Sequence, residues 1–575
     1  MSLDRNFTGT AGQHFGESSA PVGSNSASAP TAQEPLDLLV IGAGPHALSL
    51  LTRLIDDEPD LMSEAERIHL MQRARARSHA EVRHHLLKRF DLKSKVRVGT
   101  GSSASNSIHN STLVIDTHGR WMAQWAADFE AFGIEFLRSH EYLHPDPYDF
   151  QSLTVWAKMR NRGSELKQMN CVDRRDCHRV GFKGPFVTPG SRLFLDFCAD
   201  LVARYGLEQI VRKGTVEEIQ ILPPQPCSGE GPHSVKAGKG SDPQPETGKN
   251  DQMSLTQRHL LEVVLSDGRR FIARWVVCAM GPGPAFQGMH ATLPWWAEEL
   301  ECALGGGQIH ETHPLDSSVD HSAGVTLEGE ICSEHRLQHS STLSKWLLQT
   351  EAKNVLQNRR VLIVGGGQTS AHLVHVAIAR GASAVTLCSR KRICRKPFDV
   401  DASFVGFLRP NMLQQFWQLE DFRARKQFNA ALRNGGSMSG EAYADLAARV
   451  GERLDLAEEN EVVQAHWCPL TEKIQVRLED GRLSSFDFVW LATGGNFDLE
   501  LVPVLASLKR QAPIPCVGSL PQLQGDLRWA AGLPVYVMGA FAQLQLGADA
   551  LNLAGARAGG VVVARALLRD GLGSD

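Results

Sequence analysis

The stretch LDLLVIGAGPHALSLLTRLI, residues 36–55, decides the fold. It opens with a mainly apolar run, Leu36–Ile41, whose length suits a central parallel strand that is buried on both faces. The turn Gly42-x-Gly44-x-x-Ala47 follows, and after it comes a helical pattern of apolar residues. Strand, glycine turn and helix in this order predict the phosphate-binding unit of a dinucleotide-binding α/β fold.

Each small residue of this turn has a physical task. Gly42 permits the tight turn, Gly44 lets backbone N–H groups approach a pyrophosphate, and Ala47 lets the helix pack close to the strand. The N-terminus of the helix, which carries Pro45 and His46, faces the anion. We therefore expect these five residues to line a dinucleotide site.

The residue that binds the adenosine ribose in such a site is an acid at the end of the next strand. The next strand pattern is IHLMQRA, residues 68–74, where this position falls on Gln72. An amide also hydrogen-bonds ribose hydroxyls, so Gln72 is a candidate ribose contact.

A second unit of the same kind lies in RRVLIVGGGQTSAHLVHVAIARGASAVTLCSRKR, residues 359–392. A buried strand, Val361–Val364, leads into Gly365-x-Gly367-x-x-Ser370, and a helix follows. We expect this turn to bind a second dinucleotide through five residues: Gly365, Gly367, Gln368, Thr369 and Ser370.

The strand after the second helix ends differently from that of a typical NADH site. Ala384–Cys388 leads into Ser389-Arg390-Lys391-Arg392, where an NADH enzyme has an acid that repels a 2′-phosphate. A hydroxyl and three cations bind that phosphate instead, so these four residues predict NADPH as the coenzyme.

Two dinucleotide sites in one chain have a chemical use, because a nicotinamide in one domain reduces a flavin in the other. We predict an α/β fold with two Rossmann-like dinucleotide-binding domains, for FAD and NADPH, the NADPH domain being inserted into the FAD domain. The crossings between them are predicted in VVCAMGPG (276–283) and VWLATGG (489–495), with Thr493 and Gly494 as cofactor contacts. The predicted boundaries are 36–340 and 491–575 for FAD and 341–490 for NADPH, with a helical substrate segment at 399–450.

Two segments cannot offset the entropy of ordering and are predicted to be disordered. Residues 1–35 are rich in Ser, Ala, Gly and Pro with almost no large apolar side chains, and residues 222–256 have the same character. Strand patterns flank the second segment, and a tight turn at Asp267-Gly268 follows, so we expect a surface insertion in a hairpin.

Composition narrows the function class. The formal net charge of −4 gives no global positive field, so we expect no nucleic-acid partner. The 11 cysteines contain no CxxC pair, which indicates free thiols in a reducing, cytoplasmic setting and no metal site. No apolar run is long enough to span a membrane and residues 1–35 have no signal-peptide pattern, so neither membrane insertion nor secretion is expected.

Several motifs resemble the flavin-dependent N-hydroxylating monooxygenases, the lysine and ornithine N-monooxygenase family. They are GAGPHALSL (42–50), HSSTLSKW (339–346), VLIVGGGQTSAH (361–372), ATGG (492–495) and LGADALNLAGAR (546–557). The resemblance covers most of residues 36–565. It implies FAD at the first turn, NADPH at the second, and molecular oxygen as a reactant. It also implies hydroxylation of an amine nitrogen of a small molecule by a flavin C4a-hydroperoxide, which retained NADP⁺ shelters.

The resemblance also points to site residues. AFAQLQLGADALNL is similar to the flavin-closing end of the family, which makes Gly547, Asn552 and Leu553 candidate FAD contacts. Asp399–Tyr443 occupies the place of the substrate-binding segment, but its end, NGGSMSGEAY (434–443), lacks the Asn-Tyr pair typical where ornithine is held. The substrate and the catalytic residues therefore stay unassigned.

Several alternatives remain open. The same cofactors serve other FAD and NADPH oxidoreductases and S-oxygenating or Baeyer–Villiger-type oxygenases. A pyridine nucleotide–disulfide reductase would need a redox cysteine pair, which Cys388 and Cys394 do not form by their spacing. A more distant resemblance to oxidative-stress growth-inhibitor proteins favours a non-enzymatic stress or growth-regulatory flavoprotein. The oligomeric state is left open, with a homo-oligomer among the options.

Overall fold

Strand β1, Leu36–Ile41, is a central strand of a seven-stranded mixed sheet, the first of the two large sheets. It pairs in parallel with β2 (Thr112–Asp116) on one side and with β8 (Arg270–Cys278) on the other. Its residues Leu38–Val40 are fully buried. The apolar run therefore forms the buried parallel strand that its composition predicts.

The computed structural model describes eleven stretches of the chain, and contacts group Pro35–Asp575 into one unit. The described residues are 34–56, 61–62, 111–147, 151–169, 186–223, 259–281, 289–291, 293–304, 335–348, 352–405 and 408–573. The predicted disordered tail 1–35, except for its last two residues, lies outside them. Gln72 and most of the predicted insertion 222–256 lie outside them as well.

The first sheet has the strand order β5-β2-β1-β8-β7-β6. Its other members are β5 (Val211–Lys213), β6 (Val216–Ile221), β7 (Leu261–Leu265) and β23 (Val535–Val537). The long strand β8 pairs with β7 through its first half and in parallel with β23 through its second half. Antiparallel pairing of β6 with β7 confirms the hairpin that the sequence predicts around the insertion.

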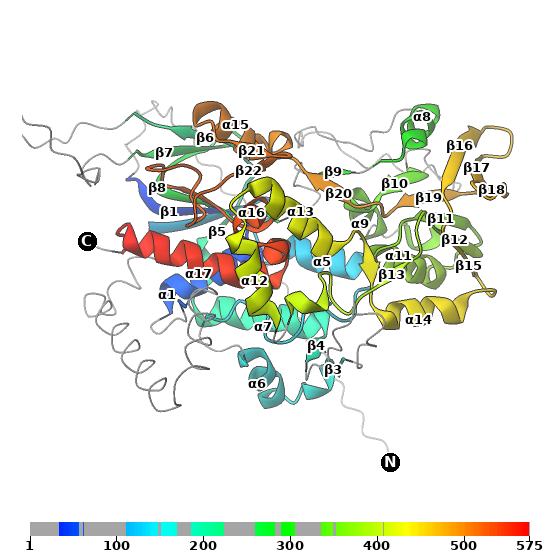
Figure 1. The fold of residues 1–575 in the computed structure, drawn as a ribbon, viewed down its shortest axis with the longest axis horizontal. Coiled ribbons are helices and arrows are strands. Elements are labelled where there is room, and N and C mark those ends of the chain that lie inside the picture. The colour runs from blue at the N-terminus through cyan, green and yellow to red at the C-terminus, as the bar shows by residue number, and fades with distance from the viewer. Residues whose placement is uncertain are drawn as a thin grey trace, which may run out of the picture. The chain divides into compact units, whose positions relative to one another are not determined.

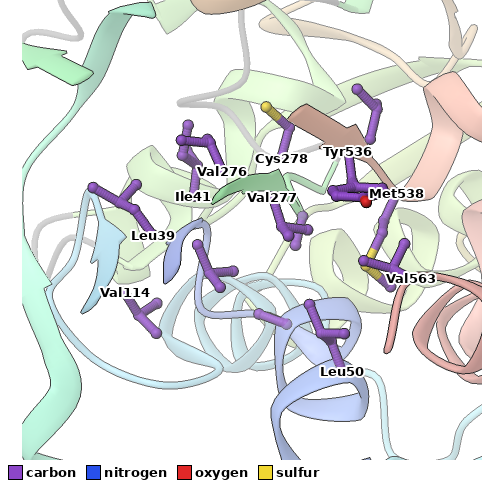
Figure 2. Packing of buried hydrophobic residues seen from close by; sticks show 14 of the residues in the cluster. Leu39, Ile41, Leu50, Val114, Val276, Val277, Cys278, Tyr536, Met538 and Val563 are labelled. Atoms are coloured by element: carbon purple, nitrogen blue, oxygen red, sulfur yellow. The ribbon is translucent and has the colours of Figure 1, made fainter. Parts of the chain in front are cut away.

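Two helices pack on this sheet and on each other. Helix α1 (Pro45–Ile55) follows β1, and helix α17 (Leu553–Arg569) runs beside it in Figure 1. Gly560 allows the close approach, because a Cβ there would meet the carbonyl oxygen of Ser49 at 3.0 Å. Figure 2 shows the apolar core between these elements, with side chains from β1, β2, β8, α1 and the C-terminal region.

The second sheet is formed by strands that lie between β8 and β23 in the sequence. The strand order of this sheet is β10-β19-β11-β12-β15, and each pair of adjacent strands is parallel. The strands are β10 (Leu337–His339), β11 (Arg360–Val364), β12 (Ala384–Ser389), β15 (Leu454–Glu458) and β19 (Phe488–Leu491), side by side in Figure 1. Helix α11 (Gln368–Ala379) joins β11 to β12.

Two short strands join the sheets. Strand β9 (Met289–Ala291), which comes after β8, pairs antiparallel with β20 (Gly495–Phe497), which comes after β19. The two predicted chain crossings therefore lead into one ribbon. Strand β10 belongs to the stretch 36–340 that the sequence assigned to the first domain, yet it pairs with β19 of the second sheet.

The segment 399–450 is helical, as its apolar spacing predicts. It contains α12 (Arg409–Gln418), α13 (Phe422–Arg433) and α14 (Gly440–Arg449). Between α13 and α14, strand β14 (Ser437–Met438) pairs with β13 (Cys394–Arg395).

The remaining elements complete the described chain. The helices are α5 (Ala123–Ala131), α6 (Ser152–Met159), α7 (Ser191–Arg204), α8 (Trp295–Ala303), α9 (Ser340–Leu348), α10 (Ala352–Val355), α15 (Pro503–Gln511) and α16 (Gln543–Leu546). The strands are β3 (Leu166–Gln168), β4 (Val187–Pro189), β16 (Val462–Cys468), β17 (Lys473–Leu478), β18 (Leu483–Phe486), β21 (Cys516–Val517) and β22 (Leu520–Pro521). Among the described helices, none combines the length and the apolar character needed to cross a membrane.

Candidate functional site

The first glycine turn is shaped by Gly42. Its φ is +101°, and a Cβ there would meet the carbonyl oxygen of Ala279 at 2.9 Å. Its N–H donates to the carbonyl of Ile115 at 2.8 Å, which ties the turn to β2. The backbone conformation and the close approach to β8 both require glycine at this position.

Gly44 serves a different purpose. It caps α1 with φ −93°, a conformation that any residue adopts, and none of the described residues lies within 4 Å of the position of an added Cβ. The described part of the chain therefore leaves space beside Gly44, at the place where dinucleotide folds bring the backbone to the pyrophosphate. Pro45 occupies the first helical position and Ala47 is fully buried, as the sequence predicts.

His46 lies in the first turn of α1. The residue is 7% exposed, and within the described part of the chain its Nδ1 has no hydrogen-bond partner. Burial lowers the pKa of His46 to about 4, so the ring is neutral near pH 7. A Cβ added to Gly539 would come within 3.9 Å of this ring. An unsatisfied buried nitrogen at a helix N-terminus is available to a ligand.

Asp116 occupies the position that the sequence reasoning sought in Gln72. In the parallel register Ile41 is opposite Ile115, so Asp116 follows directly beyond the end of β1. Its Oδ2 accepts the N–H of Ala43 at 3.1 Å, and its Oδ1 accepts the N–H of His118 at 2.8 Å. The apolar run that ends in an acid, TLVID (112–116), is the signal that could have identified it.

The second glycine turn repeats the geometry of the first. Gly365 has φ +148°, its N–H donates to the carbonyl of Cys388 at 2.9 Å, and a Cβ would meet the carbonyl oxygen of Ala492 at 2.3 Å. Gly367 caps α11, and the buried Ser370 hydroxyl donates to its carbonyl at 2.6 Å. Half-buried Thr369 lies in the first turn of the helix.

The basic turn follows β12 directly. Val364 pairs with Cys388, so Ser389 is the counterpart of Asp116 in this sheet. Ser389 is buried and its hydroxyl donates to the carbonyl of Lys391 at 2.7 Å. Arg390, Lys391 and Arg392 are all exposed. The chain therefore presents three cations to solvent at the carboxyl end of β12.

Thr493 and Gly494 lie just beyond β19, beside the second turn. The Thr493 hydroxyl is buried with no hydrogen-bond partner among the described residues. Gly494 has φ +74°, and its carbonyl lies 3.1 Å from Nε2 of fully buried His339. The HSSTLSKW segment is therefore tied to the crossing between the sheets.

Asn552 of the C-terminal motif has a structural task. Its Oδ1 accepts the N–H groups of Ala554 and Gly555, which caps α17. Its Nδ2 donates to Asp549 at 3.0 Å and to Asp399 at 3.3 Å. The side chain is therefore engaged within the chain. Two further predicted contacts, Gly547 with φ +88° and the half-buried Leu553, flank this group.

A cavity of about 50 Å³ lies where the helical segment meets the C-terminal motif. Arg409 pairs with Asp549, and Arg433 pairs with Asp399 at 3.2 Å. The walls combine charged and apolar groups: Arg138, Ser139, His140, Leu143, Phe398, Asp399, Val400, Phe404, Val405, Arg409, Asp549, Asn552 and Ala554. Sequence reasoning identified the segment 399–450 but missed the contribution of residues 138–143.

Two residues that line the cavity, Arg138 and His140, have lowered pKa values. Burial lowers the pKa of Arg138 to about 10, and its Nε is buried without a hydrogen-bond partner in the described structure. Burial, and next the guanidinium of Arg409, lower the pKa of His140 to about 3. Nδ1 of His140 accepts the N–H of Tyr142 at 3.3 Å, so the neutral ring carries its proton on Nε2. Over the described residues, no group of three or more His, Cys, Asp or Glu side chains could hold a metal ion.

Comparison with solved structures identifies the fold. The ornithine N-hydroxylase of Kutzneria sp. 744 has a TM-score of 0.53 and 14% identity, over 93% of this chain and 99% of that chain. L-lysine 6-monooxygenase of Pseudomonas syringae has a TM-score of 0.53 and 17% identity, over 93% of this chain and 99% of that chain. The cadaverine monooxygenase of Erwinia amylovora has a TM-score of 0.52 and 13% identity, over 93% of this chain and 95% of that chain. No family model and no curated protein matches the sequence. The chain therefore has the fold of these N-hydroxylating monooxygenases.

Proposed function

We propose that this chain is an FAD- and NADPH-dependent monooxygenase that hydroxylates an amine nitrogen of a small molecule. The equivalence of the two glycine turns carries this proposal. In each turn, the N–H of the first glycine donates to a carbonyl of the neighbouring strand. The residue that follows this carbonyl is Asp116 in the first sheet and Ser389 in the second. An acid suits the ribose hydroxyls of FAD, and a hydroxyl followed by cations suits the 2′-phosphate of NADPH.

The residues of the first turn fit FAD. The described residues leave space beside Gly44 for the pyrophosphate, Nδ1 of His46 has no hydrogen-bond partner among them, and the Asp116 carboxylate accepts the N–H of Ala43 just beyond β1. We assign Asp116 as the ribose contact, while Gln72 stays a prediction from the sequence. We retain the predicted division into an FAD domain and an inserted NADPH domain, and place the start of the insertion before β10.

The second turn fits NADPH through Gly365, Gln368, Thr369 and the basic turn that follows β12. Arg390 and Arg392 are free to approach a 2′-phosphate, since both are exposed. FAD activates oxygen and NADPH supplies hydride when they are bound. The chain contributes binding, orientation and exclusion of water.

The cavity beside Asp549 is the proposed substrate site. Its ion pairs hold Asp399 and Asp549 in place, and the Nε2–H of neutral His140 is a donor that does not titrate near pH 7. The similar solved structures are named for ornithine, lysine and cadaverine, which supports an amine as the substrate class.

The test is an assay of purified protein with NADPH, oxygen and each of these three amines. We expect a yellow protein that NADPH bleaches without oxygen, and with oxygen a hydroxylamine product formed in step with NADPH oxidation. Peroxide release with every amine, but no hydroxylamine, would instead indicate an oxidase or another substrate class. A colourless protein would overturn the FAD assignment and favour a binding or regulatory role without flavin.

A further inference from the structure

The segment Asn434–Ser439, which links α13 to α14, lies against the second glycine turn. A Cβ added to Gly436 would meet Cα of Gly367 at 3.3 Å and its nitrogen at 3.4 Å. A Cβ added to Gly367 would in turn lie 3.8 Å from Cα of Gly436. Beside Gly44 in the first turn, the described part of the chain has no such neighbour within 4 Å.

Glycine at position 436 is explained by this contact. Gly435 needs glycine for its conformation, because its φ is +73°, but Gly436 does not lie in the left-handed region. A Cβ at 436 would require the segment and Gly367 to separate by a few tenths of an ångström, since 3.3 Å from Cβ to a backbone atom is tighter than normal packing. The sequence NGG at 434–436 therefore permits the segment to close on the turn.

Hydrogen bonds hold the segment in this position. The Ser439 N–H donates to Oε1 of Gln368, in the first turn of α11, at 2.8 Å. Arg138, from the chain before β3, donates to the carbonyl and to the hydroxyl oxygen of Ser437, both at 2.9 Å. Pairing of β14 with β13 adds a third attachment.

We propose that Asn434–Ser439 is a strap over the second nucleotide site, which must move away before the coenzyme pyrophosphate reaches Gly367. This inference rests on the proposed binding of NADPH at that turn. The second glycine of such a turn is where the backbone approaches the pyrophosphate, and Gly436 now occupies that approach. Opening the strap breaks the bond between Ser439 and Gln368, which releases Oε1 of Gln368 while its Nε2 stays 3.3 Å from Nε2 of His372.

A pair of substitutions at Ser439 isolates this bond. Ser439 has φ −67°, which suits proline, so Ser439→Pro removes the N–H donor without backbone strain. Both Ser439→Pro and Ser439→Ala lose the hydroxyl that caps α14 by accepting the Ala442 N–H, but only alanine keeps the bond to Gln368. The experiment is calorimetric titration of NADP⁺ into three FAD-loaded proteins, the wild type, Ser439→Pro and Ser439→Ala. Ser439→Pro should bind NADP⁺ about two- to tenfold more tightly than Ser439→Ala, because one neutral hydrogen bond no longer opposes opening.

Each outcome decides a different claim. Equal or weaker binding by Ser439→Pro than by Ser439→Ala, with measurable binding by the wild type, would overturn the strap and leave the NADPH assignment in place. Failure of all three flavoproteins to bind NADP⁺ would overturn the NADPH assignment and the strap with it. Hydrogen exchange gives a second readout: the Ser439 amide should exchange faster in the wild type when NADP⁺ is added, and unchanged or slower exchange would contradict opening.

Discussion

The two glycine turns have the same backbone geometry but different surroundings. Gly42 and Gly365 both have positive φ, and each donates its N–H to a carbonyl of the neighbouring strand. Among the described residues, no neighbour lies within 4 Å of an added Cβ at Gly44, whereas Gly436 lies beside Gly367. We infer that the first turn is preformed for a cofactor that stays bound, whereas the second is covered in a way that suits a coenzyme that enters and leaves.

The end of the neighbouring strand shows a second difference. At Asp116 the acid also accepts the N–H of Ala43, so the same carboxylate that would hold a ribose stabilises the turn. At Ser389 the hydroxyl donates within its own turn, and the charge comes from Arg390 and Arg392, which are exposed. Under the proposed function, binding at the first turn would depend on a rigid internal group, and binding at the second on surface cations.

The largest expected effects come from the first glycine of each turn. Both Gly42→Ala and Gly365→Ala should destabilise the fold by at least about 3 kcal/mol, because each adds a Cβ at positive φ against a backbone carbonyl. Gly365→Ala should be worse, since its Cβ would lie 2.3 Å from the oxygen against 2.9 Å for Gly42. Chemical denaturation followed by circular dichroism measures both. Equal stability to the wild type in either variant would contradict the geometry of that turn.

Gly44→Glu should separate binding from folding. The new side chain enters open space, so the free energy of unfolding of the FAD-free chain should change little. A carboxylate beside the pyrophosphate should nevertheless weaken FAD binding more than about a hundredfold, by repulsion and by occupying its place. Gly525→Glu is the control, because Gly525 is exposed and an added Cβ there also has no described residue within 4 Å. Normal FAD content in Gly44→Glu would refute the first site.

The sequence predicts the two turns well because their signals are local. Strand, glycines and helix are consecutive, so periodicity and the spacing of Gly42 and Gly44 identify them without tertiary information. Sequence reasoning did not propose Asp116, because the nearer strand pattern ends in Gln72, which lies outside the described residues. The pairing of β1 with β2 is what identifies Asp116 as a residue beside the turn.

The cavity and the strap could not be predicted from the sequence, because both depend on contacts between residues that are far apart in the chain. Arg138 bonds Ser437 across 299 positions of the chain, and Arg409 pairs with Asp549 across 140. No periodicity links such positions, because their proximity follows from how the helical segment packs on the rest of the chain. The resemblance identified the segment 399–450 but not which of its side chains face residues 138–143.

Replacing Arg390 and Arg392 by Ala tests the cationic end of the second turn. The KM for NADPH should rise about ten- to a hundredfold, since a charge-assisted contact contributes about 1.5–3 kcal/mol, while the KM for NADH should change little. The rate of flavin reduction at saturating NADPH should be nearly constant, because the phosphate is remote from the hydride. Anaerobic stopped-flow reduction with both coenzymes measures this. Equal weakening for NADPH and NADH would mean that the basic turn is only a solvated surface.

The smallest effect concerns His46, which takes the position in the first turn that Thr369 takes in the second. Burial lowers the pKa of His46 to about 4 from the ordinary 6.5, so the unfolded chain binds more protons between these values. Its contribution to stability is therefore complete above about pH 6.5 and is lost as the pH falls toward 4, by about 2 kcal/mol between pH 7 and pH 5. Buried His140 and His372 shift in the same direction, so the wild type alone cannot isolate the effect. His46→Thr makes the turns alike, and the FAD-free variant should lose about 2 kcal/mol less than the FAD-free wild type over this interval. Parallel denaturation curves at the two pH values would show instead that the ring is solvated in the folded chain.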